Sequence, residues 1–209
     1  DFLARLKSTR LGLRFEHLLC FWLQDEGYHP YQLLGHSIQK IAGSTTLGEL
    51  DFLLFNQHTQ QVEHWEVALK YYLAEAELNL AQWFGLNRAD TLQRKLQHFT
   101  QRQFQFSKAN ELPIQVKFAV MKGQLFLPDI PNNIALPGWI NTSRRLGLWG
   151  THIPAAPYQR LQRHEWLCPN QQATSTTAKW WTNGLYYSAN AAAQFYMFRQ
   201  APLLFAANS

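Results

Sequence analysis

Apolar and polar residues alternate along two neighbouring segments of the chain, 49–55 and 62–73, which are separated by the polar stretch 56–61. Alternation with a period of two is typical of strands that bury one face. A short polar stretch between two such strands predicts a hairpin loop. We therefore expect an antiparallel hairpin that lies inside a core. One of its faces is apolar throughout, formed by Leu50, Phe52, Leu54, Trp65, Val67, Leu69 and Tyr71.

The hydrophobic pattern predicts further elements on either side of this hairpin. Apolar residues at helical spacing indicate an amphipathic helix over 10–26, which Gly27 ends, and a helix over 90–106, which Asp90 or Thr91 caps. The other expected elements are a strand over 31–42, a turn over 43–48, a helix over 74–84, and strands over 114–121 and 124–127 around a tight turn at Lys122 and Gly123.

The pattern becomes irregular in the last third of the chain, where five Pro fall within 128–157. The segments 158–168 and 179–200 favour short aromatic strands or a helix. We expect a core over 1–127 and an aromatic-rich C-terminal extension over 128–209 that packs on it. The tryptophans of this extension either fill a core or stack on unpaired bases; they are Trp139, Trp149, Trp166, Trp180 and Trp181.

Composition and charge narrow the class of protein. Hydrophobic residues make up 46% of the chain and charged residues 16%, which excludes a disordered chain. Two Cys are too few for a disulfide framework or a zinc ribbon, and neither an apolar run of about 18 residues nor a signal peptide is visible. We therefore expect a cytoplasmic protein with no membrane span.

The net charge of +5 is unevenly distributed along the chain. Residues 1–87 hold six Lys and Arg against ten Asp and Glu, whereas residues 88–209 hold thirteen against four. A basic segment favours a polyanionic partner such as nucleic acid.

Two carboxylates stand opposite each other in the predicted hairpin. If the loop is symmetric, Asp51 falls directly across from Glu66, with Cβ atoms about 5 Å apart, where like charges are destabilising. Either one carboxyl is protonated with a raised pKa, or a cation lies between the two. Oxygen ligands favour Mg²⁺ or Mn²⁺. Alternatively, the two acids lie in solvent at the strand ends, or a register one residue different points them apart.

Other ionisable residues accompany this pair. Glu49, His64 and Lys70 share its face of the hairpin, and Lys70 adds a positive charge. Glu16 lies near the apolar stripe of the first helix, where a charge is costly unless it is paired or coordinated. Basic residues lie on or just before the helix that follows, and they can either contact a phosphate backbone or form a solvated helix face: Arg88, Arg94, Lys95 and Arg102.

The sequence resembles two groups of known proteins. Gly48-Glu-Leu-Asp51, followed fourteen residues later by Glu66-Val67, resembles the motif of PD-(D/E)XK nucleases. More closely, the chain resembles a bacterial family of unknown function, number 1853, which has been grouped with that superfamily. The runs that carry this likeness are RLGLRFEHLLCFWL (10–23), GELDFLL (48–54), HWEVALKYYL (64–73), GLNRADTLQRKLQHF (85–99) and RHEWLCP (163–169).

The resemblance implies an α/β fold with a restriction-endonuclease-like core, in which helices flank a mixed central sheet. It also implies that Asp51 and Glu66 are metal ligands, with Glu16 as the first-helix acid and the Val67 carbonyl as a further ligand. The motif lysine, two residues after the Glu, is replaced by Ala68. The catalytic lysine is then expected at Lys70, whose long side chain can reach back towards Glu66 or pair instead with Glu49.

The function implied is hydrolysis of DNA phosphodiester bonds with Mg²⁺ or Mn²⁺. In that reaction Lys70 orients the attacking water or stabilises the charge that develops on the phosphate. The alternatives are a catalytically inactive PD-(D/E)XK module that binds nucleic acid or protein, which Ala68 favours, and an interaction protein that works through its aromatic extension.

Overall fold

The chain forms a mixed α/β fold with a large mixed sheet and few helices in the part that the computed structural model describes. The described residues are 10–75, 77–130, 135–152, 158–169 and 183–199. Two compact units are present: the first comprises Asp1–Lys70 and Asp90–Gly123, and the second comprises Tyr71–Ala89 and Gln124–Ser209. Within the described ranges, no helix is both long and apolar enough to cross a membrane.

The first unit contains a helix, a three-stranded meander, a second helix and a further strand. Its elements are α1 (Leu11–Leu23), the 3₁₀ helix η2 (Glu26–Tyr28), β1 (Tyr31–Ala42), β2 (Thr45–Asn56), β3 (Gln61–Ala74), α2 (Leu92–Gln101), the 3₁₀ helix η4 (Gln103–Gln105), β5 (Lys108–Ala109), β6 (Leu112–Pro113) and β7 (Val116–Pro128). β3 and β7 each continue into the second unit.

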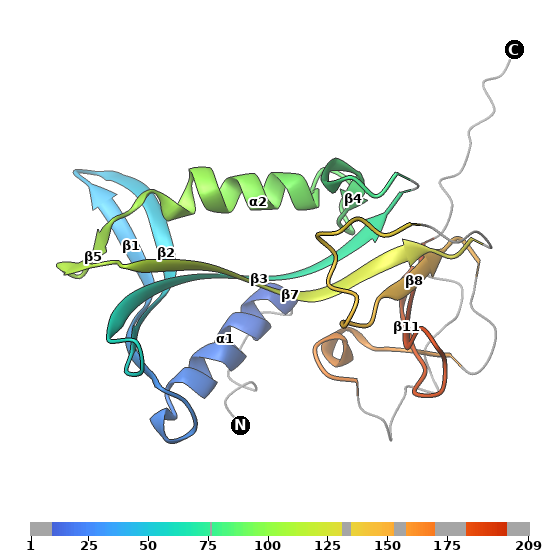
Figure 1. Ribbon diagram of the computed structural model, residues 1–209, viewed down its shortest axis with the longest axis horizontal. Coiled ribbons are helices and arrows are strands. Elements are labelled where there is room, and N and C mark those ends of the chain that lie inside the picture. The colour runs from blue at the N-terminus through green and yellow to red at the C-terminus, as the bar shows by residue number, and fades with distance from the viewer. Residues whose placement is uncertain (1–9, 76, 131–134, 153–157, 170–182, 200–209) are drawn as a thin grey trace, which may run out of the picture. The chain divides into compact units, whose positions relative to one another are not determined.

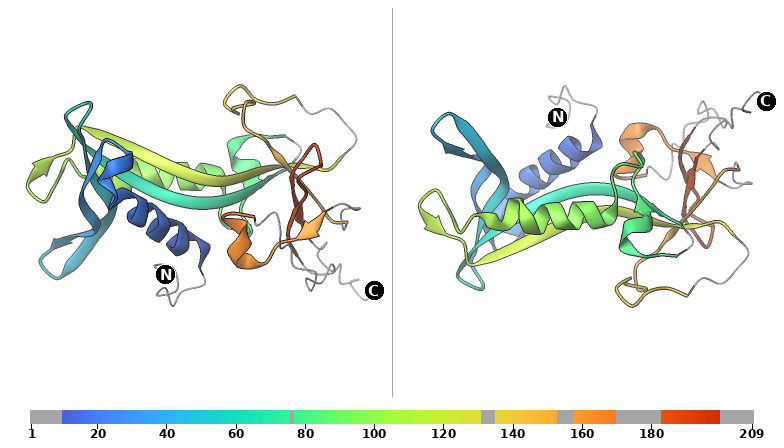
Figure 2. Two further views of the ribbon diagram at one scale, coloured as in Figure 1. Left: turned by 90° about the horizontal axis from the view of Figure 1, so that it is seen from below. Right: turned by 90° about the horizontal axis from the view of Figure 1, so that it is seen from above.

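The sheet of the first unit combines antiparallel and parallel pairing. β1, β2 and β3 pair antiparallel in chain order, and β7 lies beside β3. The Gln115 N–H donates to the Val62 carbonyl, and Gly123 lies against the Lys70 carbonyl. In both contacts the later residue follows its partner in β3 by 53 positions. Because this difference stays constant along the strands, β3 and β7 run in parallel. Parallel strands require a crossover connection, and α2 is its helix. α1 and α2 lie on opposite faces of β3 and β7 in this unit (Figures 1 and 2).

The predicted register of the central hairpin is confirmed. Phe52 pairs with Trp65 and Leu53 with His64, so the position numbers of partners add up to 117. Glu63 fixes this register from inside the hairpin, because its buried carboxylate accepts hydrogen bonds from Asn56 Nδ2 and Trp65 Nε1, both at 2.7 Å. The Asn56 bond links β2 to β3 next to the loop, and the Trp65 bond lies within β3. Together they satisfy a charge that is expensive to bury unpaired.

The two faces of the hairpin pack against different elements. α1 covers the predicted apolar face, where Cys20 and Leu23 contact Phe52 and Leu54. The expectation for Leu50 is wrong, because Leu50 packs in a second cluster with Leu53, Val62 and Ala109. Regular pairing of β2 with β3 ends at Phe52, so the strict alternation that placed Leu50 beside Phe52 does not extend to it.

The two turns predicted around glycines differ from the structure. The six-residue turn over 43–48 is too long, because β1 and β2 pair up to Ala42 and Thr45, and Gly43 makes the turn with φ +60°. The tight turn predicted at Lys122 and Gly123 is absent, because β7 continues through both residues as a single strand, Val116–Pro128. Gly123 has φ +130° because the β3 backbone passes directly over it.

The helix expected over 74–84 is also wrong. Leu78 has φ +51°, which interrupts a helix, and the segment returns instead to β3. It contains the 3₁₀ helix η3 (Leu80–Gln82) and β4 (Trp83–Phe84), whose Trp83 is fully buried. Tertiary burial of this aromatic ring therefore outweighs the helical propensity of the Ala- and Leu-rich segment. The helices predicted on either side are confirmed. α1 ends before Gly27. Thr91 caps α2, because its side chain accepts a hydrogen bond from the Arg94 N–H.

The second unit adds strands to the ends of β3 and β7. β4 pairs with β3, β8 (Gly147–Gly150) pairs in parallel with β7 and with β11 (Phe195–Phe198), and β11 is followed in the sheet by β10 (Gly184–Tyr187) and β9 (Gln159–Arg160). A 3₁₀ helix, η5 (Arg163–Trp166), precedes the last two strands in the chain. Aromatic rings of β10 and β11 form a core of this unit.

The tryptophans of the second unit have different environments. Trp166 is buried edge-on against Tyr71, as expected for a core residue. Trp149 is half-buried and donates from Nε1 to the Ala74 carbonyl, whereas Trp139 is 44% exposed. The remaining two, Trp180 and Trp181, lie outside the described residues.

Gly123 provides a test of the close approach between β3 and β7. A Cβ added here would lie 1.7 Å from the Lys70 carbonyl oxygen, so Gly123→Ala should lower the free energy of unfolding by more than about 1 kcal/mol. Gly12 in α1 is the control: a Cβ there meets nothing within 4 Å, and Gly12→Ala should stabilise by about 0.5–1 kcal/mol. Urea unfolding measures both, and equal effects would contradict the packing described.

Candidate functional site

Asp51 and Glu66 meet at the end of the regular β2–β3 pairing. Asp51 is half-buried, and its Oδ2 accepts a hydrogen bond of 2.7 Å from the Val67 backbone N–H. Glu66 has no exposed surface. Asp51 lies one residue beyond the last regular pair, and its carboxylate contacts the strand segment that carries Glu66.

Glu66 has one satisfied and one unsatisfied carboxylate oxygen. Oε1 lies 2.6 Å from His64 Nε2, and both side chains are fully buried. Oε2 and His64 Nδ1 are buried without a hydrogen-bond partner. Buried polar atoms in folded proteins nearly always have a partner, so an unsatisfied carboxylate oxygen beside a second carboxylate indicates a place for a ligand. Phe104 of η4 covers the ring of His64 edge-on at 5.7 Å.

Burial and mutual repulsion perturb the carboxyl pair. Burial raises the pKa of Asp51 from 3.8 to about 7, and the charges of Glu66 and Glu16 add to this effect, while the Val67 N–H and Lys95 oppose it. Burial likewise raises the pKa of Glu66 from 4.5 to about 7, while nearby polar groups of Asp51 and the charge of Lys95 oppose this effect. These groups therefore change protonation near neutral pH.

His64 responds to burial in the opposite direction. Burial lowers its pKa from 6.5 to about 4, with the charge of Lys117 adding to this and that of Asp51 opposing it. The imidazole is therefore neutral near pH 7. A neutral ring can donate from Nε2 to Glu66 and thereby orient that carboxylate without balancing its charge.

Lys95 of α2 is the cation that acts on the pair. Leu92 and Phe99 are the buried residues of this helix, and Lys95 lies three positions after one and four before the other. It therefore belongs to the helix face that turns towards the sheet. Its ammonium lies 4.0 Å from the centre of the Phe99 ring. Burial and then the charge of Lys70 lower its pKa, while both carboxylates raise it.

The helical spacing of Lys95 was a signal that could have identified this role. The sequence predicts that Lys95 either contacts a phosphate backbone or belongs to a solvated face of this helix. Positions three after or four before a buried residue lie on the same helix face, and Lys95 has both relations, to Leu92 and to Phe99. A lysine within such a stripe indicates a buried acidic partner.

Lys70 and Glu49 do not form the pair that the sequence allows. The Lys70 ammonium lies 2.5 Å from Asp90 Oδ2, just before α2, and the two side chains are each 31% exposed. Glu49 is exposed, and its charge is the smallest contribution to the raised pKa of Glu66. The charge of Lys70 is therefore largely compensated by Asp90.

Glu16 pairs with a histidine of β1. Its Oε1 lies 2.8 Å from His36 Nε2 and accepts a 3.4 Å hydrogen bond from Ser37 Oγ. Among the described residues, no group of three His, Cys, Asp or Glu side chains is arranged to hold a metal ion. The predicted ligand set of Glu16, Asp51 and Glu66 is thus not assembled, because the α1–β1 contact gives Glu16 a different partner.

The remaining pair nevertheless fits a hard divalent cation. Mg²⁺ commonly binds one or two protein carboxylates and keeps several waters or substrate phosphate oxygens. Asp51 and Glu66 provide two carboxylates, and Oε2 of Glu66 is unsatisfied. The Val67 backbone adjoins Asp51 through its N–H, and its carbonyl stays a predicted further ligand.

The other predicted basic residues lie apart from this cluster. Arg94 and Arg102 are exposed on α2 and at its C-terminal end. Arg88 belongs to the second unit, where it pairs with Glu75 at 2.6 Å and lies over the ring of Phe84. Of the four, Lys95 is the one whose charge acts on both carboxyls.

Comparisons with known proteins support a family assignment. No curated protein and no solved structure matches the chain. A family model described as "Domain of unknown function (DUF1853)" matches residues 1–207. Because the match spans almost the whole sequence, the chain belongs to the DUF1853 family.

Proposed function

We propose that this protein is a metal-dependent nuclease that hydrolyses DNA phosphodiester bonds at Asp51 and Glu66. The observation that carries the proposal is the buried carboxylate pair with an unsatisfied Glu66 oxygen, next to the half-buried ammonium of Lys95. A structural core gains nothing from two acids in this arrangement, since burying like charges together is costly. A cation removes that cost.

The order of elements in the first unit supports the same proposal. α1, the β1–β2–β3 meander, α2 and β7 follow one another as a helix, three antiparallel strands, a helix and a further strand. This is the order that the resemblance to PD-(D/E)XK nucleases implies. In that arrangement the two motif acids lie on β2 and β3, which are the strands that carry Asp51 and Glu66.

Each side chain of the site has a role in such a reaction. A bound Mg²⁺ or Mn²⁺ ion supplies Lewis-acid activation of a water and of the scissile phosphate. Asp51 and Glu66 hold the ion, and His64 orients Glu66 through Oε1 so that Oε2 stays available. Lys95 stabilises the negative charge that develops on the phosphate. It thereby replaces the motif lysine, whose position is taken by the buried Ala68.

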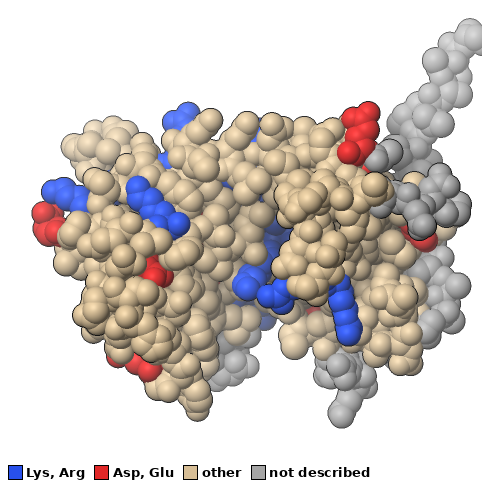
Figure 3. Space-filling model, viewed as in Figure 1, with Lys and Arg blue, Asp and Glu red and all other residues tan. Residues whose placement is uncertain are grey.

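DNA contacts in this proposal come from few residues. Arg94 and Arg102 are exposed on the helix that carries Lys95, so they can bind backbone phosphates next to the site. On the face that Figure 3 shows, Lys and Arg side chains form small separate groups, one of which adjoins acidic side chains. We therefore expect a modest salt dependence of DNA binding, because its slope scales with the number of neutralised phosphates.

A second candidate function is a catalytically inactive module that binds nucleic acid or a protein partner. Ala68 at the motif position and the engagement of Lys70 by Asp90 favour it. Binding of DNA without metal-dependent cleavage would support this function over the first.

Asp51→Asn provides the direct test of the nuclease. The amide keeps the size of the side chain and removes its charge, so cleavage of linear, branched and single-stranded DNA with Mg²⁺ or Mn²⁺ should fall by more than about 100-fold. Glu49→Gln, which changes an exposed acid of the same strand, should stay close to the wild-type rate. Cleavage that persists in the Asp51 variant would exclude this site.

Two variants test whether Lys95 or Lys70 stabilises the charge that develops on the phosphate. Lys95→Ala removes the charge that acts on both carboxyls, and its cleavage rate should fall by about 10²–10³-fold. Lys70→Ala should have a much smaller effect, because Asp90 already compensates that charge. Initial rates at saturating metal measure both variants. A larger loss in the Lys70 variant would show that Lys70, as the sequence predicts, and not Lys95 stabilises the charge on the phosphate.

The raised carboxyl pKa values predict how pH acts on the metal-free protein. A carboxyl whose folded pKa exceeds its unfolded value contributes stability that is lost as pH rises through the folded pKa, so the free energy of unfolding should fall between pH 6 and 8. Metal binding requires deprotonated ligands, so Mg²⁺ should stabilise more at pH 8 than at pH 6.

Thermal unfolding measures this coupling. At a Mg²⁺ concentration 100 times Kd, about 2.7 kcal/mol of stabilisation should raise Tm by about 5–10 °C at pH 8. The Asp51→Asn/Glu66→Gln double variant should lose both the pH dependence and the response to Mg²⁺. An equal response in wild type and double variant would place the metal elsewhere.

A further inference from the structure

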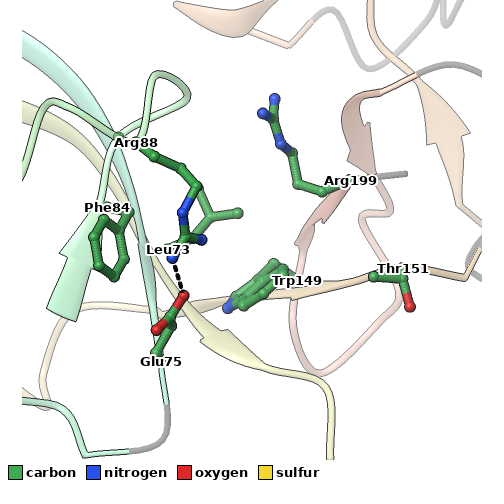
Figure 4. A pocket seen from close by; sticks show the side chains of 8 residues that line it. Leu73, Glu75, Phe84, Arg88, Trp149, Thr151 and Arg199 are labelled. Carbon is green, nitrogen blue, oxygen red and sulfur yellow. Dashed lines mark hydrogen bonds and ion pairs between the residues drawn. The ribbon is translucent and has the colours of Figure 1, made fainter. Parts of the chain in front are cut away.

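The second unit contains a pocket of its own, with a volume of about 380 Å³. Its lining combines cationic, aromatic and small polar side chains: Leu73, Glu75, Phe84, Gly85, Arg88, Trp149, Thr151 and Arg199 (Figure 4). All of these residues belong to the second unit. The volume lies at the small end of the range for pockets that take small molecules, so it suits a single nucleotide better than a duplex.

Arg199 is the basic residue of this pocket that is available to an anion. It follows β11, is half-buried, and donates from Nη2 to the Leu86 carbonyl at 3.0 Å. Among the residues that the structure describes, no carboxylate lies within ion-pair distance of it. Burial lowers its pKa, which is the expected response of a cation removed from water without a negative partner.

Arg88 contributes less charge because it already has a partner. Its Nη2 lies 2.6 Å from Glu75 Oε1, whereas the guanidinium of Arg199 points away from this ion pair (Figure 4). The lining thus holds two guanidinium groups and one carboxylate, which leaves one excess positive charge. A guanidinium fork matches the geometry of phosphate oxygens, so this charge favours a phosphate group.

Trp149 gives the pocket a fixed aromatic wall. Its Nε1 donates to the Ala74 carbonyl at 2.8 Å, which holds the indole of this β8 residue in one orientation. A fixed aromatic face is a stacking surface for a nucleobase. Phe84 is engaged by the Arg88 guanidinium, 4.2 Å from its ring centre, so Trp149 is the aromatic side chain left for stacking. Thr151, an exposed residue of the lining, adds a side chain that carries a hydroxyl.

We propose that this pocket binds a nucleotide, with its phosphate on Arg199 and its base stacked on Trp149. The ligand is either a free mononucleotide or the 5′-phosphorylated end of a nucleic acid strand, since both present a base next to a phosphomonoester. Recognition here does not depend on cleavage at Asp51 and Glu66, because no residue of that pair lines the pocket.

Calorimetric titration of the full chain with dAMP tests the proposal. Arg199→Gln should weaken dAMP binding by about 10- to 100-fold, because it removes a charged hydrogen-bond donor. Trp149→Leu should also weaken it, by removing the stacking surface. Arg144→Gln, an exposed arginine outside the pocket lining, is the matched control and should bind as wild type. Thermal unfolding of each variant checks that it is folded, and Arg199→Lys should bind with intermediate affinity.

Further ligands distinguish the source of the nucleotide. A 5′-phosphorylated oligonucleotide that binds more tightly than its 5′-hydroxyl counterpart identifies a strand end, whereas binding of dAMP alone identifies a free nucleotide. The proposal is overturned if dAMP does not bind, if Arg199→Gln binds as wild type, or if inorganic phosphate binds as tightly as dAMP. Asp51→Asn should bind dAMP as wild type does. Calorimetry therefore tests the nucleotide proposal, and DNA cleavage tests the nuclease proposal separately.

Discussion

The register of the β2–β3 hairpin is the constraint on which the first unit depends. Side chains alternate between faces with a period of two, so a slip of one residue would exchange the core face and the site face. The buried Glu63 opposes such a slip, because Asn56 of β2 donates to its carboxylate across the hairpin in the observed pairing. With this register, Phe52 and Leu54 face α1, and Asp51 meets the strand at Glu66.

Charge compensation decides which ionisable residues act together. Glu16 and Lys70, both expected beside the carboxyl pair, have His36 and Asp90 as their partners, although the charge of Glu16 still raises the pKa of Asp51. Lys95 holds a half-buried position whose pKa is lowered by burial, and the attraction of the two carboxylates offsets part of that cost. Asp51 and Glu66 in turn remain partly protonated near neutral pH, because burial raises the pKa of both carboxyls more than Lys95 lowers it.

The fold also redistributes the charge that the linear sequence separates. Division of the sequence at position 88 gives an acidic and a basic part. In the structure, by contrast, the first unit holds 12 Lys and Arg against 10 Asp and Glu, and the second unit holds 7 against 4. The contrast disappears because α2 and β7 return basic residues to the unit that contains the acidic hairpin. Each unit then carries its own chemistry, the carboxyl pair in the first and the arginine-lined pocket in the second.

The sequence by itself determined the hairpin and its register from the loop as far as Phe52 and Trp65, because alternation and loop length are local properties of neighbouring strands. It also determined α1 and α2, whose apolar spacing is local too. Tertiary structure decided that the charge of Lys95 acts on the carboxyl pair, that His36 pairs with Glu16, and that 74–84 contains η3 and β4 instead of a helix. These outcomes depend on contacts between segments far apart in the chain, and their free energies exceed the local preferences that a sequence pattern records.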